Sequence, residues 1–103
     1  MSYSVVFAET ATRQLTAIRD YIADAADPDI AAAYVDAIVE HCLSLETFPH
    51  RGSRRDDLRP GLRTIGFRRR VVIIFDADDA TLGVTIHGVF YGGQDFESAL
   101  AEG

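Results

Sequence analysis

Arginine is the residue type in this sequence with the clearest capacity for binding chemistry. All ten basic side chains are arginine, and eight of them lie within residues 51–70, where only Asp56 and Asp57 oppose them. Eight arginines against two aspartates give this segment a charge of +6, whereas two arginines against fourteen acids give the rest of the chain −12. Such a segment is expected to attract an acidic partner, either a phosphate backbone or an acidic peptide, while the acidic body repels loosely bound nucleic acid. The eight are Arg51, Arg54, Arg55, Arg59, Arg63, Arg68, Arg69 and Arg70.

Three consecutive arginines end this basic segment. Alternation in a strand sends Arg68 and Arg70 to one face of a sheet and Arg69 to the other. Two interpretations stay open. In the first, an arginine lies along a packed surface with its guanidinium in water, or pairs with Asp76 or Asp78 across a hairpin. In the second, the guanidinium groups form a fork that binds carboxylate or phosphate groups.

Other reactive side chains give weaker signals. Cys42 falls on the apolar stripe of a predicted helix, which favours a small core residue over a nucleophile. His41, His50 and His87 fall on a helix, a loop and a strand, without the spacing that metal sites commonly show. We therefore expect no metal site, no cofactor and no hydrolytic triad, and we expect His87 to have a structural role.

The elements that position these residues begin with a strand at residues 3–7, followed by an amphipathic helix from Glu9 to near Ala26. Asp27-Pro28 has the composition of a helix N-terminus, so a second helix is predicted from there to near Phe48. The link between them is so short that the two helices must form an antiparallel hairpin. The apolar stripes are Ala11, Leu15, Ile18 and Ile22 on the first helix, and Ala31, Tyr34, Val35, Ile38, Cys42 and Leu45 on the second.

The second half of the chain is typical of a sheet. Residues 49–61 predict a polar loop, and strands are expected at residues 62–67, 71–75 and 82–91, the last two joined as a hairpin. A short final helix is expected at residues 95–101. The order β-α-α-β-β-β predicts an α+β fold in which the helical hairpin packs on a mainly antiparallel four-stranded sheet.

Composition sets outer limits on function. The chain has 103 residues, 48% of them hydrophobic, and a net charge of −6. This predicts one domain over residues 1–103 with a single small core, whose function lies on a surface or in a shallow groove. No apolar run approaches the length of a membrane span, and the N-terminus has no signal-peptide pattern, so a cytoplasmic protein without membrane contact is expected.

Several segments together resemble the RelE/ParE toxins of bacterial type II toxin–antitoxin systems, the ParE branch in particular. The opening helix, with Tyr21-Ile22, is similar to that of the family. The most specific stretch runs from Phe48-Pro49 and Gly52 through residues 57–63, and the closing hairpin is similar at residues 71–75. The last strand contributes Ile86, Val89, Tyr91, Gly92 and Asp95 to the resemblance.

The resemblance implies a cytoplasmic toxin neutralised by a cognate ParD-like antitoxin. The ParE branch poisons DNA gyrase, which implies a noncatalytic protein that contacts gyrase and meets DNA only through gyrase or the antitoxin. The implied target-binding residues are Arg54, Arg55, Arg59, Arg63, Arg68, Arg70 and Tyr91. The implied antitoxin-binding residues are Leu15, Ile18, Ile22, Tyr34, Ile38 and Arg69.

Two alternatives stay open. The RelE branch cuts mRNA on the ribosome, and Arg63 and Tyr91 correspond to two RelE-like catalytic positions. The chain has no lysine, however, and Gly88 replaces an arginine that the family often carries in the last strand, which weakens the nuclease interpretation and also any target-binding role of that position. The other alternative is an inactive homologue that only binds its antitoxin and regulates the operon.

Overall fold

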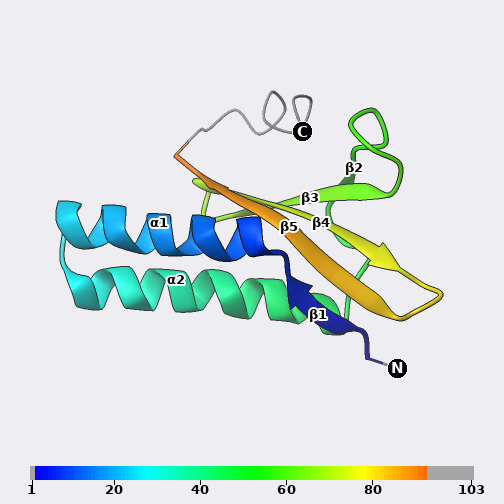
Figure 1. Cartoon of the computed structure of the whole chain (residues 1–103), viewed down its shortest axis with the longest axis horizontal. Helices are drawn as coiled ribbons and strands as arrows, with labels where there is room; N and C mark the ends of the chain where they lie inside the picture. Colours follow the sequence, from blue (N-terminus) through cyan, green and yellow to red (C-terminus); the bar gives the residue numbers. More distant parts are fainter. Residues whose placement is uncertain (1, 93–103) are drawn as a thin grey trace.

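Two antiparallel helices follow the N-terminal strand β1 (Ser4–Phe7) in the computed structural model, which describes residues 2–92. Helix α1 spans Glu9–Ala25 and helix α2 spans Pro28–Leu43. They lie side by side along one face of the sheet (Figure 1). The helical hairpin predicted from the apolar stripes is confirmed.

The start of α2 shows why the chain turns back so tightly. The Oδ1 atom of Asp27 accepts hydrogen bonds from the backbone N–H groups of Asp29 (2.6 Å) and Ile30 (3.2 Å). Pro28 occupies the first helical position, where no N–H is required. Only two residues, Ala26 and Asp27, lie between α1 and α2, as the sequence predicts.

The end of α2 comes earlier than expected. The helix ends at Leu43 and tightens into one turn of 3-10 helix, η1 (Ser44–Glu46), rather than continuing to near Phe48. The Ser44 hydroxyl donates a hydrogen bond of 2.5 Å to the carbonyl of His41, and Arg51 Nη1 donates one of 3.0 Å to the same hydroxyl. A side chain that bonds to the last turn in this way competes with further α-helical bonding.

The sheet has five strands, one more than expected. Its order is β1-β5-β4-β3-β2, with β1 parallel to β5 and every other pair antiparallel. The additional strand β2 lies in the segment predicted to be a loop, where Ser53 pairs with Thr64 and Arg54 with Arg63. The helix expected at residues 95–101 lies outside the described residues. The bounds are Ser53–Arg54 for β2, Leu62–Phe67 for β3, Val71–Asp78 for β4 and Gly83–Tyr91 for β5.

The core lies between the helices and the sheet. Strand β4 is flanked by β3 and β5, and its Ile73, Ile74 and Phe75 are completely buried, as expected for a strand that is apolar at every position. On the helical side, both stripes pack inward. The buried helical residues are Ala11, Leu15, Ile18 and Ile22 from α1, and Ala31, Ile38 and Cys42 from α2.

Candidate functional site

The basic segment divides into two clusters at opposite ends of β3. The loop cluster, which we define as Arg54, Arg55, Arg59 and Arg63, surrounds β2 and the start of β3. The arginine turn, which we define as residues 68–70, connects β3 to β4 at the other end (Figure 1). Five residues of extended chain separate Arg63 from Arg68, which corresponds to about 16 Å. The target-binding arginines predicted from the sequence therefore do not form one continuous strip.

The charge of the loop cluster is partly neutralised within the chain. Arg54 Nη2 lies 2.9 Å from Asp56 Oδ2, and Arg55 holds Asp57 in a two-pronged contact through Nε (3.0 Å) and Nη2 (2.9 Å). The Arg55 contact holds the pKa of Asp57 below its ordinary range. A hydrogen bond from the Gly61 N–H (2.8 Å), and then the nearby Arg54 charge, lower the pKa of Asp56. The loop is thus held by its own ion pairs.

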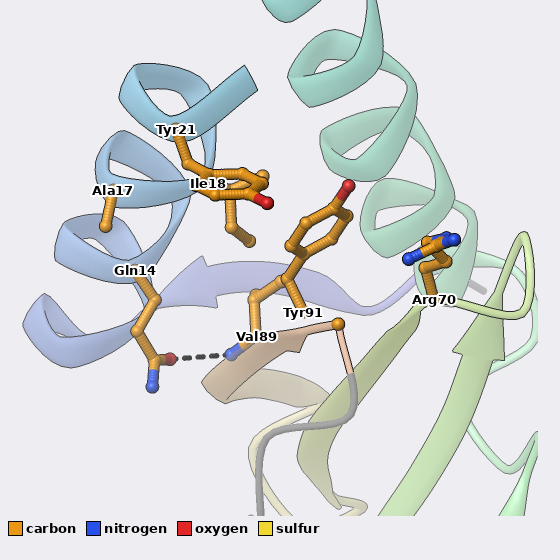
Figure 2. Close-up of a pocket in the computed structure, with 8 residues that line it drawn as sticks. Gln14, Ala17, Ile18, Tyr21, Arg70, Val89 and Tyr91 are labelled. Atoms are coloured by element: carbon orange, nitrogen blue, oxygen red, sulfur yellow. Dashed lines mark hydrogen bonds between the residues drawn. The ribbon is translucent and has the colours of Figure 1, made fainter. Parts of the chain in front are cut away.

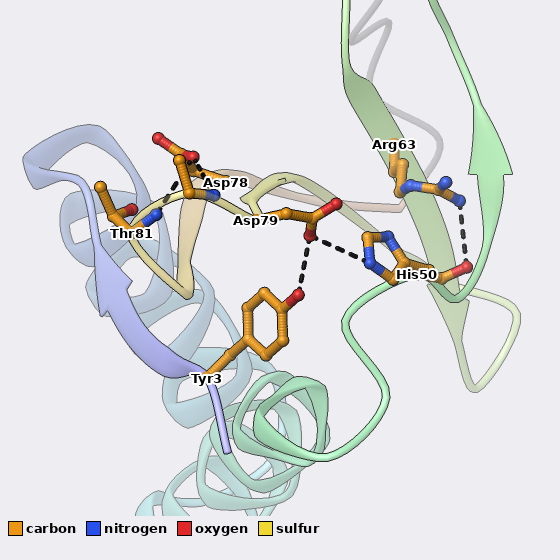
Figure 3. Close-up of polar contacts among 7 residues, drawn as sticks. Tyr3, His50, Arg63, Asp78, Asp79 and Thr81 are labelled. Atoms are coloured by element: carbon orange, nitrogen blue, oxygen red, sulfur yellow. Dashed lines mark hydrogen bonds and ion pairs between the residues drawn. The ribbon is translucent and has the colours of Figure 1, made fainter. Parts of the chain in front are cut away.

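Arg63 is held by the loop that precedes β2. Its Nη1 donates a hydrogen bond of 3.0 Å to the backbone carbonyl of His50 (Figure 3). The imidazole of His50 points the other way, with Nε2 3.1 Å from Asp79 Oδ1, and the Tyr3 hydroxyl donates to the same oxygen at 2.8 Å. These contacts connect Arg63 through His50 to Asp79 in the β4–β5 turn and to Tyr3 before β1. The arrangement favours a positioning role for His50, Asp79 and Tyr3.

The arginine turn has an unusual backbone. Arg68 and Arg69 have φ angles of 49° and 64°, and the Arg70 N–H donates a 3.3 Å hydrogen bond to the Phe67 carbonyl. Positive φ at both central residues is the pattern of a type I′ hairpin turn, for which Asn-Gly is preferred and arginine is not. The expectation that Arg68 to Arg70 alternate along a strand is wrong, because alternation requires extended backbone and these residues form the turn itself.

Aromatic rings support one arm of the arginine turn. The Arg68 guanidinium lies over the rings of Phe67 (4.9 Å to the centroid) and Tyr34 (5.7 Å). Among the described residues, none of the three arginines has an ion-pair partner, because Asp76 contacts His87 and Asp78 accepts hydrogen bonds from the Ala80 and Thr81 N–H groups. The predicted alternative in which the arginines pair with these aspartates is therefore not what the structure shows.

A groove adjoins the arginine turn. It has a volume of about 390 Å³ and runs between α1 and the end of β5. Tyr91 projects from β5 into the space between the two helices, with its ring centroid 5.9 Å from those of Tyr21 and Tyr34 (Figure 2). The lining residues are Gln14, Ala17, Ile18, Tyr21, Arg70, Val89, Tyr91 and Gly92. Burial, with the neighbouring Tyr91, raises the pKa of Tyr34.

One wall of this groove is an uncovered part of the β5 edge. Strand β1 pairs with β5 only as far as Phe7 opposite Ile86, and the next hydrogen bond runs from the Ala8 N–H to the Ile86 carbonyl. Beyond that point a side chain of α1 replaces the strand as the hydrogen-bond partner of β5, because Gln14 Oε1 accepts a 2.7 Å hydrogen bond from the Val89 N–H (Figure 2). Sequence reasoning missed Gln14, and nothing in a single sequence pairs two residues so far apart.

The two candidate nuclease residues lie well apart. Phe67, Val71 and Tyr91 form one row across three strands, whereas Arg63 pairs with Phe75. Arg63 is four residues before Phe67, so it is displaced from Tyr91 by about 13 Å along the strands and by two strand spacings across them. The structure does not bring these two side chains together around one small group.

The predicted antitoxin-binding residues have mixed positions. Tyr34 is half-buried beside the arginine turn and Arg69 is exposed in it. The four aliphatic residues are at most 9% exposed, because the apolar stripes of α1 and α2 pack on the sheet. In this structure they contact the core, and the accessible part of the hairpin is carried by other side chains, such as Tyr21 (63% exposed) and Ile30 (54%). The four buried aliphatic residues are Leu15, Ile18, Ile22 and Ile38.

The remaining reactive side chains have structural surroundings. Cys42 is fully buried, and burial raises the pKa of its thiol to about 12, so the expected core role is supported. His87 lies at a bulge of β5 with its Nε2 2.8 Å from Asp76 Oδ2. Burial lowers the pKa of His41, with a contribution from Arg51. Within residues 2–92, no three His, Cys, Asp or Glu side chains are grouped so as to hold a metal ion.

The sequence over residues 5–96 matches the model of the ParE toxin of the type II toxin–antitoxin system parDE. The chain therefore belongs to the ParE toxin family. The resemblance to RelE/ParE toxins expected from the sequence is confirmed.

Solved structures share the fold. A chain of the chromosomal ParDE toxin–antitoxin system from P. aeruginosa is 24% identical, with a TM-score of 0.75 over 87% of this chain and 96% of that one. A chain of the RelBE2 toxin–antitoxin complex from Mycobacterium tuberculosis is 25% identical, with a TM-score of 0.61 over 88% of this chain and 99% of that one. A variant of the E. coli toxin RelE in the free state is 13% identical, with a TM-score of 0.69 over 99% and 96%.

No curated protein sequence matches this chain at a significant level. In the part of the chain that the structure describes, neither helix has both the length and the apolar character needed to cross a bilayer.

Proposed function

We propose that this toxin inhibits DNA gyrase by protein–protein contact and performs no covalent chemistry of its own. The observation that carries the proposal is the separation of Arg63 from Tyr91, together with membership of the ParE family. RNA cleavage by general acid–base catalysis needs both groups within hydrogen-bond reach of one phosphate. The backbone positions of Arg63 and Tyr91 are displaced by about 13 Å along the sheet, and their side chains contact the His50 carbonyl and the rings of Tyr21 and Tyr34, which does not suit joint catalysis at one phosphate.

The contacts of the two candidate residues support the same conclusion. Arg63 is bonded to the His50 carbonyl, and Tyr91 packs among the rings of Tyr21 and Tyr34. A group that binds a transition state needs its donors directed at the reacting atoms. Both side chains are directed at other parts of the protein, which suits structural roles.

The target face in this proposal is centred on the arginine turn and the end of β5. Three guanidinium groups project there without ion-pair partners among the described residues, next to a groove with two tyrosines. Arginine and tyrosine are among the side chains most enriched at the energetic centres of protein interfaces. The loop cluster, whose Arg54 and Arg55 already have acidic partners, contributes less to binding.

The partner that neutralises the toxin is proposed to be a ParD-like antitoxin. The P. aeruginosa and M. tuberculosis neighbours are described as toxin–antitoxin systems, one of them as a complex. We place the antitoxin on the outer side of the helical hairpin, over Tyr21 and Ile30, with an acidic segment reaching Arg69. Covering Tyr21 also covers the groove, so antitoxin binding removes the target face by mass action.

The test is a supercoiling assay with purified toxin, gyrase, relaxed plasmid and ATP. We expect loss of supercoiling with accumulation of linear DNA, and no effect from the antitoxin-bound toxin. Arg70→Ala should weaken inhibition at least about tenfold, whereas Arg19→Ala, an exposed arginine outside the groove, should leave it unchanged. Full supercoiling at micromolar toxin would contradict the proposal.

The RelE-like alternative predicts a different set of results. A ribosome-dependent nuclease would lose mRNA cleavage abruptly on Arg63→Ala or Tyr91→Phe while still binding its antitoxin. Cleavage of mRNA on translating ribosomes by the wild type, with no effect on gyrase, would establish that alternative. Normal growth of cells that express the toxin alone would instead establish an inactive homologue.

A further inference from the structure

The arginine turn combines a positive-φ backbone with arginines that have no ion-pair partner among the described residues. Two arginines have the positive φ angles of a type I′ turn. This conformation lowers the stability of the fold when the residue is arginine, and does so less when it is glycine or asparagine. Backbone strain of this kind persists only where the surrounding structure holds it in place, and it clusters at functional sites. Its effect here is to present three consecutive guanidinium groups around one concavity of about 500 Å³, lined by residues 68–70 and Gly92.

The concavity adjoins the tyrosine groove. Arg70 and Gly92 line both spaces, so the two lie side by side on the surface. On the groove side Tyr21 is 63% exposed, and its ring lies beside that of Tyr91 (Figure 2). A cationic end and an aromatic end thus lie next to each other.

From this arrangement we infer that the arginine turn and the groove form a binding site for a short single-stranded nucleic acid. Arg69 and Arg70 bind successive phosphates of the backbone, and an unpaired base stacks on Tyr21. A guanidinium group can donate two parallel hydrogen bonds to phosphate oxygens. In single-strand binding proteins, unpaired bases stack on exposed aromatic rings such as tyrosine. The site uses the same surface as the gyrase contact proposed above, and its binding test does not require that contact.

Charge explains why the ligand is short and single-stranded. The turn supplies three positive charges, whereas the chain as a whole carries −6. A long duplex would run over the acidic body and be repelled, and its paired bases could not reach Tyr21. A few nucleotides at a strand end or in a gap satisfy the site and avoid the repulsion.

In the free toxin, an acidic peptide is the competing occupant of the whole site and fits it less well, although the acidic antitoxin segment proposed above still reaches Arg69. An acidic peptide would use the arginines but has no planar group that requires an exposed tyrosine beside them. The proposal therefore predicts that affinity depends on Arg69 and Tyr21 in different ways. The arginine acts through charge, which salt screens, and the tyrosine acts through stacking, which salt affects little.

The experiment measures fluorescence anisotropy of short labelled oligothymidylate and oligouridylate with the free toxin over a range of salt concentrations. Two phosphate contacts predict that log K falls with log salt with a slope of about −1.4. Arg69→Asn, which keeps a residue suited to positive φ, should reduce the slope by about 0.7. Tyr21→Ala should weaken binding about tenfold with the slope unchanged.

Arg19→Gln is the matched control, because Arg19 is an exposed arginine of α1 that lines neither space. It should bind as the wild type does. Comparison of the DNA and RNA oligomers shows which backbone the site prefers. The proposal fails if no oligomer binds, if Arg69→Asn binds with the wild-type slope, or if Tyr21→Ala has no effect. It also fails if polyglutamate binds as tightly and depends on both residues. None of these results requires gyrase, so they are separate from the test of the proposed function.

Discussion

The side chain of Gln14 closes the β5 edge at Val89. Its Oε1 accepts a 2.7 Å hydrogen bond from the Val89 N–H, at the place where β1 has already turned into α1. Val89 is completely buried, so its N–H has no access to water. One helical side chain thus substitutes for the missing strand.

Replacement of Gln14 tests this role directly. Gln14→Ala leaves the Val89 N–H without a partner and should lower the free energy of unfolding by about 1–3 kcal/mol, measured by urea denaturation. Gln14→Glu is the control, because it keeps an oxygen acceptor at the same position and should lose less. Equal stability of Gln14→Ala and the wild type would contradict the role.

Two glycines with positive φ should respond differently to alanine. A Cβ at Gly52 (φ 81°) would overlap the Thr64 carbonyl oxygen and the Ile65 side chain, whereas a Cβ at Gly61 (φ 83°) meets nothing within 4 Å. Gly52→Ala should therefore destabilise by more than about 3 kcal/mol, and Gly61→Ala by the conformational cost of about 1–2 kcal/mol alone. Similar shifts of both urea midpoints would contradict this explanation.

Relief of strain in the arginine turn should stabilise the fold. Arg69 has a φ of 64°, so Arg69→Gly removes a steric cost of about 1–2 kcal/mol and adds a smaller entropic cost. A net gain of about 0.5–1 kcal/mol in the free energy of unfolding is expected. Arg13→Gly in the exposed face of α1 should instead lose about 1 kcal/mol. A loss of stability in Arg69→Gly would show that the turn is not strained.

The acidic residues of the loop cluster should add a pH dependence to stability. The pKa of Asp56 is lowered in the folded protein, first by the Gly61 hydrogen bond and then by Arg54. Its contribution is fully present above the ordinary carboxyl pKa of 3.8 and is lost as the pH falls through the lower pKa of the folded state. Thermal unfolding followed from about pH 5 to about pH 2.5 should show a shallower decline for Asp56→Asn. Parallel curves for the two proteins would contradict this assignment.

Local signals in the sequence were sufficient for most of the fold. The Asp27-Pro28 start of α2, the apolar stripes of both helices and the buried strand around Ile73 all depend on nearby residues, and all are confirmed. Strand β2 was not predicted because it consists of only two polar residues, which are too few to show a strand periodicity. The fifth strand exists only because Ser53 and Arg54 find β3 beside them.

The site was harder to predict, for two physical reasons. The arginine turn was assigned to a strand because arginine seldom has positive φ, so composition gave no turn signal at residues 68–70. The groove depends on contacts between distant parts of the chain, such as Tyr21 with Tyr91, which no local pattern encodes. The sequence predicted the abundance of arginine but not its division into two clusters at opposite ends of β3.

The parallel pairing of β1 with β5 has a consequence for synthesis. The first strand of the protein borders the last strand described, and β5 lies between β1 and β4 inside the sheet. While a ribosome is still translating residues 83–91, β1 and β4 have no partner between them and the groove lacks Val89 and Tyr91. The nascent chain therefore cannot complete its sheet or its target face until translation has passed β5. A cell that makes this toxin meets the folded surface only after nearly all of the described chain has left the ribosome.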